Sequence, residues 1–255
     1  MILSAVGGKR NLKLEESMGE HAATLGRRRD RMFYVGMALL AATIVFVGFS
    51  RTYYLRGVFG RPEIGLLRHV HGFLFTSWLV LLLAQVSLVA AKRTDIHRRL
   101  GVAGGVLAAL MVVAGVTLGI NAAKQGHSPP GLSPLVFLVI PIGDMVMFST
   151  MVAAGFYYRR QSETHKRLMV MATLVLLPAA IARLPFAFIM ASGPIAFYGL
   201  ADLLLLACIG YDTVVHRRLH PAYLWGGLLL IATQPLRLFI GGTAAWLSFA
   251  HWLTS

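Results

Sequence analysis

The feature that most constrains this chain is a succession of seven long runs that carry almost no charge. Each run is close to the roughly 20 residues that a helix needs to cross a bilayer. Only 13% of the 255 residues are charged, about half the share expected of a soluble domain. We therefore predict an all-α, polytopic seven-helix transmembrane bundle. The predicted spans are 32–50, 66–91, 100–120, 134–158, 167–191, 193–214 and 222–252.

The two ends of the chain differ from these runs. Residues 1–31 are polar and basic, which predicts a cytoplasmic tail ahead of a single transmembrane domain over 32–255. The last run is too long for one upright crossing, so it must tilt, bend near Pro235, or extend beyond the hydrocarbon.

Lysine and arginine are distributed unevenly among the connections between the runs. Seventeen of the 24 lie in the N-terminal tail or in the connections at 92–99, 159–167 and 216–220. The alternate connections carry four, and the C-terminus carries none. Because basic loops stay cytoplasmic, we expect a cytoplasmic N-terminus and an outward C-terminus in a cell inner (plasma) membrane. This placement accounts for the net charge of +14 through contact with the lipid bilayer, without a nucleic-acid partner.

Three of the cytoplasmic connections carry a similar motif. Residues 92–100 read KRTDIHRRL, residues 159–168 read RRQSETHKRL, and a looser copy, DTVVHRRL, occupies 212–219. One interpretation is an internal repeat of helical hairpins. The basic residues are explained by the preference of lysine and arginine for cytoplasmic loops. The histidine that recurs in each copy is not, because a lysine would fix the cytoplasmic side of the loop better. Haem, metal or phosphate-headgroup binding are the alternatives for these histidines.

Four ionisable side chains lie well inside the runs: Asp144, Arg183, Asp202 and Arg237. Such groups are expensive in hydrocarbon unless they are paired or line a cavity. Counting 1.5 Å of helix per residue places them toward the outer side. The helical period adds neighbours on the same faces, and Pro178 and Pro185 predict a kinked helix around Arg183. We predict a buried, charged site in the outer half, formed by His71, Gln85, Asp144, Arg183, Tyr198, Asp202 and Arg237. The alternative is an ion-pair network that only fixes helix packing.

Histidines near the ends of the runs are candidate cofactor ligands. A b-type haem in a helical bundle needs two imidazoles at the same membrane depth. On the outer side, His71 matches His251, or His69. On the inner side, three histidines share one depth. The predicted cofactor-binding residues are therefore His71, His97, His165, His216 and His251.

A short stretch of this sequence resembles a known family. His71-Gly72, Gln85, His97 and Gly101, followed by a glycine-rich run, resemble the central hairpin of the ascorbate-reducible b-type cytochromes. In that family a histidine opens one core helix and His-x3-Gly opens the next. The resemblance covers about a third of the chain and implies haem b and electron transfer. The paired His-Arg segments are also similar to those of uncharacterised bacterial membrane proteins.

Three functions remain open at this point. The first is a haem b electron carrier or oxidoreductase subunit with a membrane redox partner. The second is a transporter or permease that uses the intramembrane Asp/Arg cluster as a site for a proton or a small-molecule substrate. The third is a non-catalytic membrane protein. No nucleophile elbow or P-loop is present, so no catalytic residue is assigned. With one cysteine and no HExxH motif, we predict no metal centre.

Overall fold

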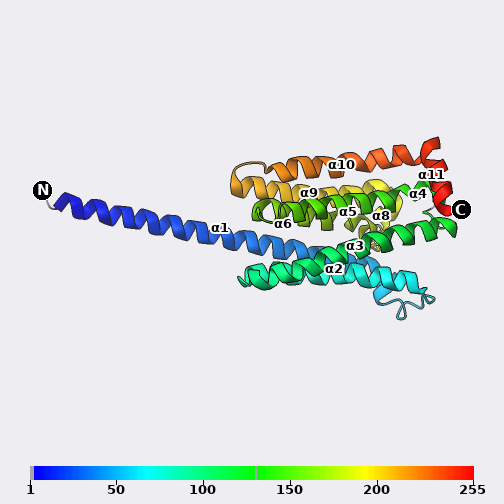
Figure 1. Ribbon diagram of the computed structural model, residues 1–255, viewed down its shortest axis with the longest axis horizontal. Coiled ribbons are helices and arrows are strands. Elements are labelled where there is room, and N and C mark those ends of the chain that lie inside the picture. The colour runs from blue at the N-terminus through cyan, green and yellow to red at the C-terminus, as the bar shows by residue number, and fades with distance from the viewer. Residues whose placement is uncertain (1–2, 130) are drawn as a thin grey trace.

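The structure is a computed structural model that describes the backbone of residues 3–129 and 131–255. Side-chain surroundings are described for residues 18, 26, 28–129, 131–189 and 191–255. Within this part the chain is 82% helical and contains no strand. Among the described residues, seven helices are long and apolar enough to cross a membrane, which confirms the predicted all-α seven-helix bundle. The helices lie side by side in an elongated bundle, and the N-terminal part of the first one extends beyond the others (Figure 1).

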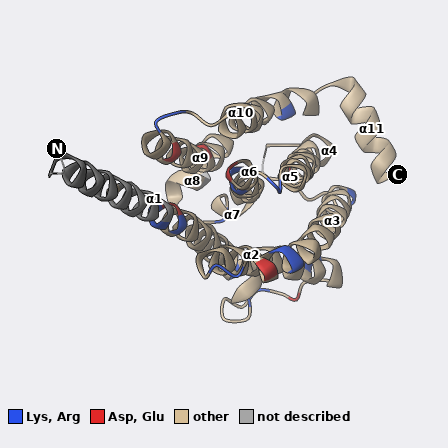
Figure 2. Cartoon of the chain, turned by 60° about the vertical axis from the view of Figure 1, so that its left-hand side comes forward, with Lys and Arg blue, Asp and Glu red and all other residues tan. Residues whose placement is uncertain are grey.

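The helices follow one another through short connections. Their bounds are α1 (Leu3–Phe49), a π-helical segment (Ser50–Tyr54), α2 (Leu66–Ala90), α3 (Thr94–Lys124), α4 (Pro134–Phe137), α5 (Val139–Tyr157), α6 (Ser162–Leu174), α7 (Leu177–Ile181), α8 (Ala187–Ser192), α9 (Pro194–His216), α10 (Pro221–Gly241) and α11 (Ala244–Thr254). The α2–α3, α5–α6 and α9–α10 connections lie at the same end of the bundle, on the left in Figure 1. We call this the inner end and the opposite one the outer end. In Figure 2 the bodies of the helices are mostly free of charged residues.

Helices α3 and α6 begin earlier than the predicted spans at 100 and 167. Asp95 lies in the first turn of α3 and Glu163 in the first turn of α6, where a carboxylate stabilises the N-terminus. His97 and His165 therefore lie within the first helical turns. The third copy of the motif differs, because His216 ends a helix and the following Arg217 has a left-handed backbone with φ 57°. The three copies do not form one repeated structure.

The fifth predicted span, 167–191, is not one helix. The helical segment starts at Ser162, and it is interrupted after Leu174 and again after Ile181. Pro178 lies in the first turn of α7, where a missing N–H is tolerated. The second interruption contains Pro185. The kink expected from the two prolines is confirmed as two breaks in the helix.

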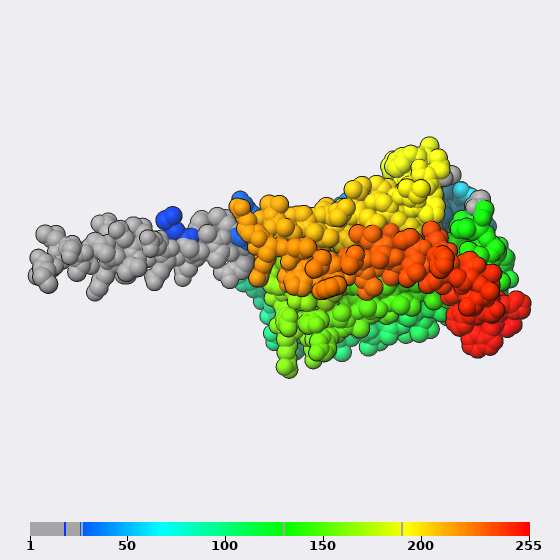
Figure 3. Space-filling view, turned by 90° about the horizontal axis from the view of Figure 1, so that it is seen from above, coloured from blue at the N-terminus to red at the C-terminus, as the bar shows by residue number. Residues whose placement is uncertain are grey.

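The last predicted span, 222–252, also divides into two helices, and the division lies after Gly241 and not at Pro235. Helix α10 continues through Pro235 and ends at Gly241. The hydroxyl of Thr243 then caps α11 by accepting from the N–H of Trp246 at 3.2 Å. Helix α11 packs against α3 and α4 and lies across the outer end of the bundle (Figure 3, red).

Helix α6 and the adjoining α7 form the most buried of the seven membrane-spanning segments. Together with α5, α9 and α10 they contribute side chains to one large apolar core, including Phe148, Met171, Leu205 and Leu230. Close packing at glycines holds the helices together. A Cβ atom on Gly226 of α10 would lie 2.6 Å from Cε of Met171, so a larger residue there would require the methionine side chain to move. This group of helices carries polar residues at both of its ends.

Candidate functional site

A small cavity lies in the outer half of the bundle, between α5, α6, α7, α9 and α10. Its volume of about 30 Å³ accommodates one or two water molecules. The polar residues that line it come from three helices: Asp144 from α5, Tyr198 and Asp202 from α9, and Gln234 and Arg237 from α10. Leu174, Val175, Pro178, Ala201, Leu205 and Leu230 complete the lining. The cavity is therefore a polar, hydratable site inside the membrane-spanning helices.

Asp144 and Arg237 form an ion pair at this cavity. A guanidinium N–H of Arg237 donates to Oδ1 of Asp144, and the two side chains are 8% and 16% exposed, respectively. Gly143 makes room for the arginine, because a Cβ atom there would lie 2.6 Å from Cδ of Arg237. Each member of such a pair neutralises a charge that would otherwise be costly in the membrane.

Asp202 is held differently. Its Oδ1 accepts a hydrogen bond of 2.8 Å from the side-chain amide of Gln234. Among the residues that the structure describes, no basic group comes within the 4.0 Å of an ion pair with this carboxyl. Tyr198, one turn earlier on α9, lines the same cavity. The site thus combines one carboxyl paired with an arginine and one whose only side-chain partner is an amide.

The structure brings together four of the seven residues predicted for the outer site: Asp144, Tyr198, Asp202 and Arg237. It adds Gln234, which sequence reasoning did not single out. The signal was present, since Gln234 precedes Arg237 by three residues and the two share a helix face.

The other three predicted residues lie elsewhere. Arg183 is exposed in the break between α7 and α8, with its guanidinium 4.8 Å from the ring centre of Phe49. His71 stacks on the ring of Phe75 at 4.0 Å, within α2, and does not line the cavity. Gln85 lies further along α2, and its amide nitrogen approaches Gly101 of α3 near the inner end. These residues are not part of the outer cavity.

The predicted histidine pairs have different outcomes. His251 is exposed on α11, which packs on α3 and α4, whereas α2, the helix that carries His71, packs on α1 and α3. On the inner side, the rings of His97 and His165 do meet, with centroids 6.3 Å apart and planes at 86°. Nδ1 of His165 lies 2.8 Å from the carbonyl oxygen of Gly155. Because a carbonyl only accepts, Nδ1 carries the proton and Nε2 is free.

The surroundings of His97 and His165 fit the iron of a haem better than its porphyrin. A separation of about 6 Å suits two imidazoles on opposite sides of one metal, given metal–nitrogen bonds of about 2 Å. One turn along α3 from His97, however, the amide of Gln85 is 3.7 Å from a Cβ position on Gly101, and two turns along it the ring of Phe156 is 3.2 Å from one on Gly105. These side chains occupy space that a porphyrin needs. Haem binding stays a prediction.

A second polar site at the inner end was missed by the sequence analysis. Arg167 of α6 and Asp212 of α9 form an ion pair in which both side chains are only 1% exposed. A second guanidinium nitrogen of Arg167 donates to the carbonyl oxygen of Glu163 at 2.6 Å and to its carboxylate at 2.8 Å. We define the inner cluster as Asp30, Tyr34, Glu163, Lys166, Arg167, Asp212, His216 and Tyr223.

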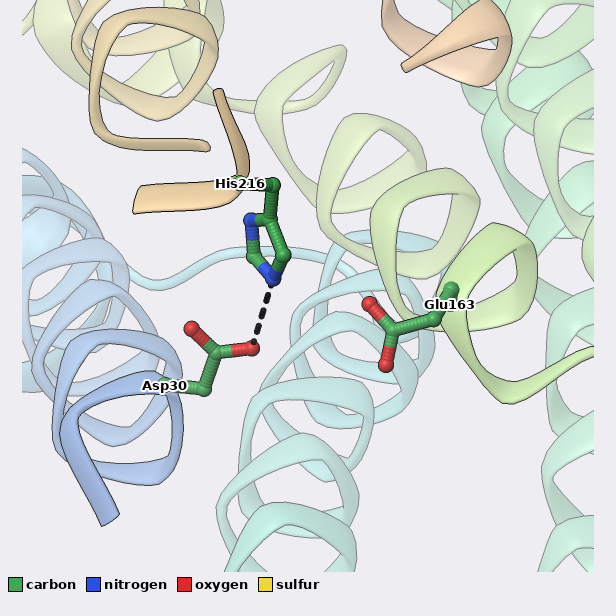
Figure 4. A group of neighbouring side chains, drawn as sticks. All are labelled: Asp30, Glu163 and His216. Carbon is green, nitrogen blue, oxygen red and sulfur yellow. Dashed lines mark ion pairs between the residues drawn. The ribbon is translucent and has the colours of Figure 1, made fainter. Parts of the chain in front are cut away.

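Three members of the inner cluster come from different helices and converge in Figure 4: Asp30 of α1, Glu163 of α6 and His216 of α9. Their possible ligand atoms lie within 4.8 Å of one another, a spacing that suits a metal ion. The ammonium of Lys166, however, lies 2.7 Å from Asp30 Oδ2 and 2.8 Å from Glu163 Oε2. A cation is therefore already in place between the carboxylates, and we interpret this group as an ion-pair network that joins α1, α6 and α9.

The sequence analysis did not predict the inner cluster, because Arg167 belongs to a basic motif whose arginines were explained by the cytoplasmic location of the loop. The equivalent residues of the other copies, Arg99 and Arg218, are exposed. Only Arg167 is buried, since α6 lies in the centre of the bundle. His216, predicted as a haem ligand, has Nδ1 3.0 Å from the backbone oxygen of Asp212 and Nε2 3.5 Å from Asp30. Both of its ring nitrogens therefore face protein oxygens.

Comparison with known proteins adds no relative to this picture. No protein family, curated protein or solved structure matches the chain. The resemblance to b-type cytochromes therefore stays a prediction from short motifs. The structure shows a seven-helix membrane fold with two polar sites.

Proposed function

We propose that this multi-pass membrane protein is a transporter of the cell inner (plasma) membrane that carries protons. The observation that carries the proposal is the pair of carboxyls at the outer cavity, of which only Asp144 has a cationic partner among the side chains that the structure describes. Ionisable groups inside a membrane that line a hydrated cavity mark ion pathways and proton relays. Arg237 fixes the charge of one carboxyl, which leaves Asp202 as the group that takes up and releases a proton.

The size of the cavity favours a proton over a large solute. Space of about 30 Å³ holds water but not an organic substrate of several heavy atoms. Water next to Asp202 supplies the hydrogen-bonded contact that a proton needs to reach the carboxyl. A small-molecule substrate that is moved with the proton requires the helices around the cavity to separate.

Replacing Asp202 with asparagine tests this function directly. We expect wild-type protein in liposomes, under a potassium diffusion potential, to admit protons faster than protein-free liposomes, as reported by a pH dye in the lumen. Asp202→Asn is expected to reduce the rate to that of the protein-free leak, because an amide keeps the hydrogen bond to Gln234 but does not titrate.

The matched control is Asp95→Asn, which removes an exposed carboxyl at the inner end. This variant is expected to conduct as the wild type does. Equal rates in wild type and Asp202→Asn would show that the charges at the outer cavity only organise helix packing, which is the non-catalytic alternative.

Haem b electron transfer is the second candidate, favoured by the 6.3 Å spacing of the His97 and His165 rings. If haem binds there, protein purified in mild detergent is expected to show a reduced b-type α-band after dithionite. The band should disappear in both His97→Ala and His165→Ala, and it should remain in His251→Ala, whose ring lies far from the pair. A colourless protein after expression with added haem contradicts this candidate.

A further inference from the structure

The two neighbouring histidines at the inner end each keep one imidazole nitrogen available for a ligand. Nδ1 of His165 donates to the carbonyl oxygen of Gly155 at 2.8 Å, and Nε2 has no hydrogen-bond partner among the described residues. The ring of His97 donates to the backbone oxygen of Gln85. Since Nδ1 of His97 is buried and without a partner, Nε2 makes that bond. Histidines that bind a metal are held in the same way, with one nitrogen on a carbonyl and the other on the ion.

The spacing of the two rings fits a single ion between them. Their centres are 6.3 Å apart, and each ring nitrogen lies about 1.2 Å from its centre, so the free nitrogens cannot come closer than about 3.9 Å, which is too long for a hydrogen bond. The same distance equals two metal–nitrogen bonds of about 2 Å on opposite sides of one ion, whereas a tetrahedral site would bring the ring centres to about 5 Å. The pair therefore favours an ion with nearly linear coordination, which occupies only the space between the two ring edges.

Helix α2 brings a further unpaired polar atom to the same depth. The indole N–H of Trp78 donates to the hydroxyl of Thr173 at 3.2 Å, which fixes α2 against α6. The two helices run in opposite directions, so two turns toward the inner end lead to Gln85 on α2 and to His165 on α6. Oε1 of Gln85 is buried and has no partner among the side chains that the structure describes. This oxygen is thus available to a cation beside the histidines.

A thioether also lies next to the pair. Met169 follows His165 by one turn of α6, so both side chains leave the same face of the helix. Sδ of Met169 is 2.8 Å from a Cβ position on Gly155, the residue whose carbonyl oxygen holds the His165 ring. Thioether sulfur is a soft ligand, and among the metals that imidazole also binds it suits monovalent copper.

We propose that His97, His165 and Met169 form a binding site for monovalent copper at the inner end of α3 and α6. The two imidazoles bind the ion from opposite sides, the thioether approaches between them, and Oε1 of Gln85 is a weak further ligand. The sequence predicted no metal centre because the chain has one cysteine and no zinc motif, but this set of ligands requires neither. The inference is independent of proton transport at the outer cavity, and it gives the histidine pair a ligand other than haem.

Competition for Cu⁺ tests the site in tag-free protein in mild detergent. With ascorbate present and oxygen excluded, we expect the wild type to withdraw one equivalent of Cu⁺ from its coloured complex with bicinchoninate. His97→Ala and His165→Ala are each expected to weaken binding by about 100-fold or more, since losing only an outer partner of a ligand costs about 10- to 100-fold. Met169→Leu should weaken binding by about tenfold.

Matched controls separate loss of a ligand from a general effect of substitution. His127→Ala and Met32→Leu change an exposed histidine and an exposed methionine, and both variants should bind Cu⁺ as the wild type does. Leucine conserves the volume of methionine, so Met169→Leu reports on the site even where a histidine variant does not fold. Proton entry into liposomes should be unchanged in Met169→Leu, which keeps this test apart from that of the proposed function.

Four results would overturn the copper site. The wild type could leave Cu⁺ with bicinchoninate, or the two histidine variants could bind it as tightly as the wild type does. Uptake of Zn²⁺ in preference to Cu⁺, with no effect of Met169→Leu, would assign the histidines to a different ion. A haem α-band in the purified protein that is lost in both histidine variants would mean that the pair binds iron in a porphyrin.

Discussion

Replacing Arg167 with methionine is expected to lower the free energy of unfolding by about 3–5 kcal/mol. The substitution leaves Asp212, which is 1% exposed, as a buried carboxylate without its cation. Methionine keeps much of the volume of the arginine stem, so the loss reports the missing charge rather than a cavity. Reversible unfolding in detergent with increasing SDS, followed by circular dichroism, measures the difference.

The repeated motif supplies the controls for this variant. Arg99→Met and Arg218→Met change the equivalent, exposed arginines of the other two copies, and each is expected to alter stability by less than about 0.5 kcal/mol. The double variant Arg167→Met with Asp212→Asn should recover most of the loss, because the uncompensated charge is gone. An Arg167→Met protein as stable as the wild type contradicts the structural role of the buried pair.

Replacing Arg237 with methionine is expected to destabilise the protein by about 2–4 kcal/mol. Asp144 then lacks its cation, but the adjoining cavity of about 30 Å³ allows water to solvate the carboxyl in part. This is the reason for a smaller effect than at Arg167. The same unfolding titration measures it, and Asp144→Asn in the Arg237→Met background should restore most of the stability.

Arg183 is the informative comparison for Arg237. The sequence places both arginines in the outer half of the membrane, but Arg183 is exposed and contacts the Phe49 ring. We expect Arg183→Met to reduce stability by less than about 1 kcal/mol. If Arg183→Met and Arg237→Met lose the same stability, both arginines belong to one buried site, as the sequence predicts. This result would contradict the outer cavity described here, which contains only Arg237 of the two.

Much of the outer site was predictable because the free-energy cost of a charged side chain in hydrocarbon is high. Such a side chain is therefore expected to have a partner of opposite charge or to line a cavity. Asp144, Asp202 and Arg237 were identified on this ground, and helix depth brought them to one level. Depth along a helix does not say which way a side chain faces, however. His71 and Arg183 share that level and lie outside the cavity, His71 because of the face it occupies and Arg183 because its helix ends at Ile181.

The inner cluster could not be predicted from the sequence. Arg99, Arg167 and Arg218 occupy equivalent places in similar motifs, and sequence alone gives each the same topological role. Their environments differ because α6 is central, α3 is peripheral, and the third copy follows the end of a helix. Burial is a property of how helices pack, and a local motif carries no information about it.

The seven spanning helices of this all-α membrane bundle are predictable from the amino-acid sequence, because the length of an apolar run depends only on consecutive residues. Charge distribution likewise predicted which connections share one end. The tertiary structure alone decided that Gln234 joins Asp202, that His97 meets His165, and that Arg167 finds Asp212 in the core. Each of these contacts joins residues more than 30 positions apart. Helix rotation and packing set them, and these are governed by the whole bundle.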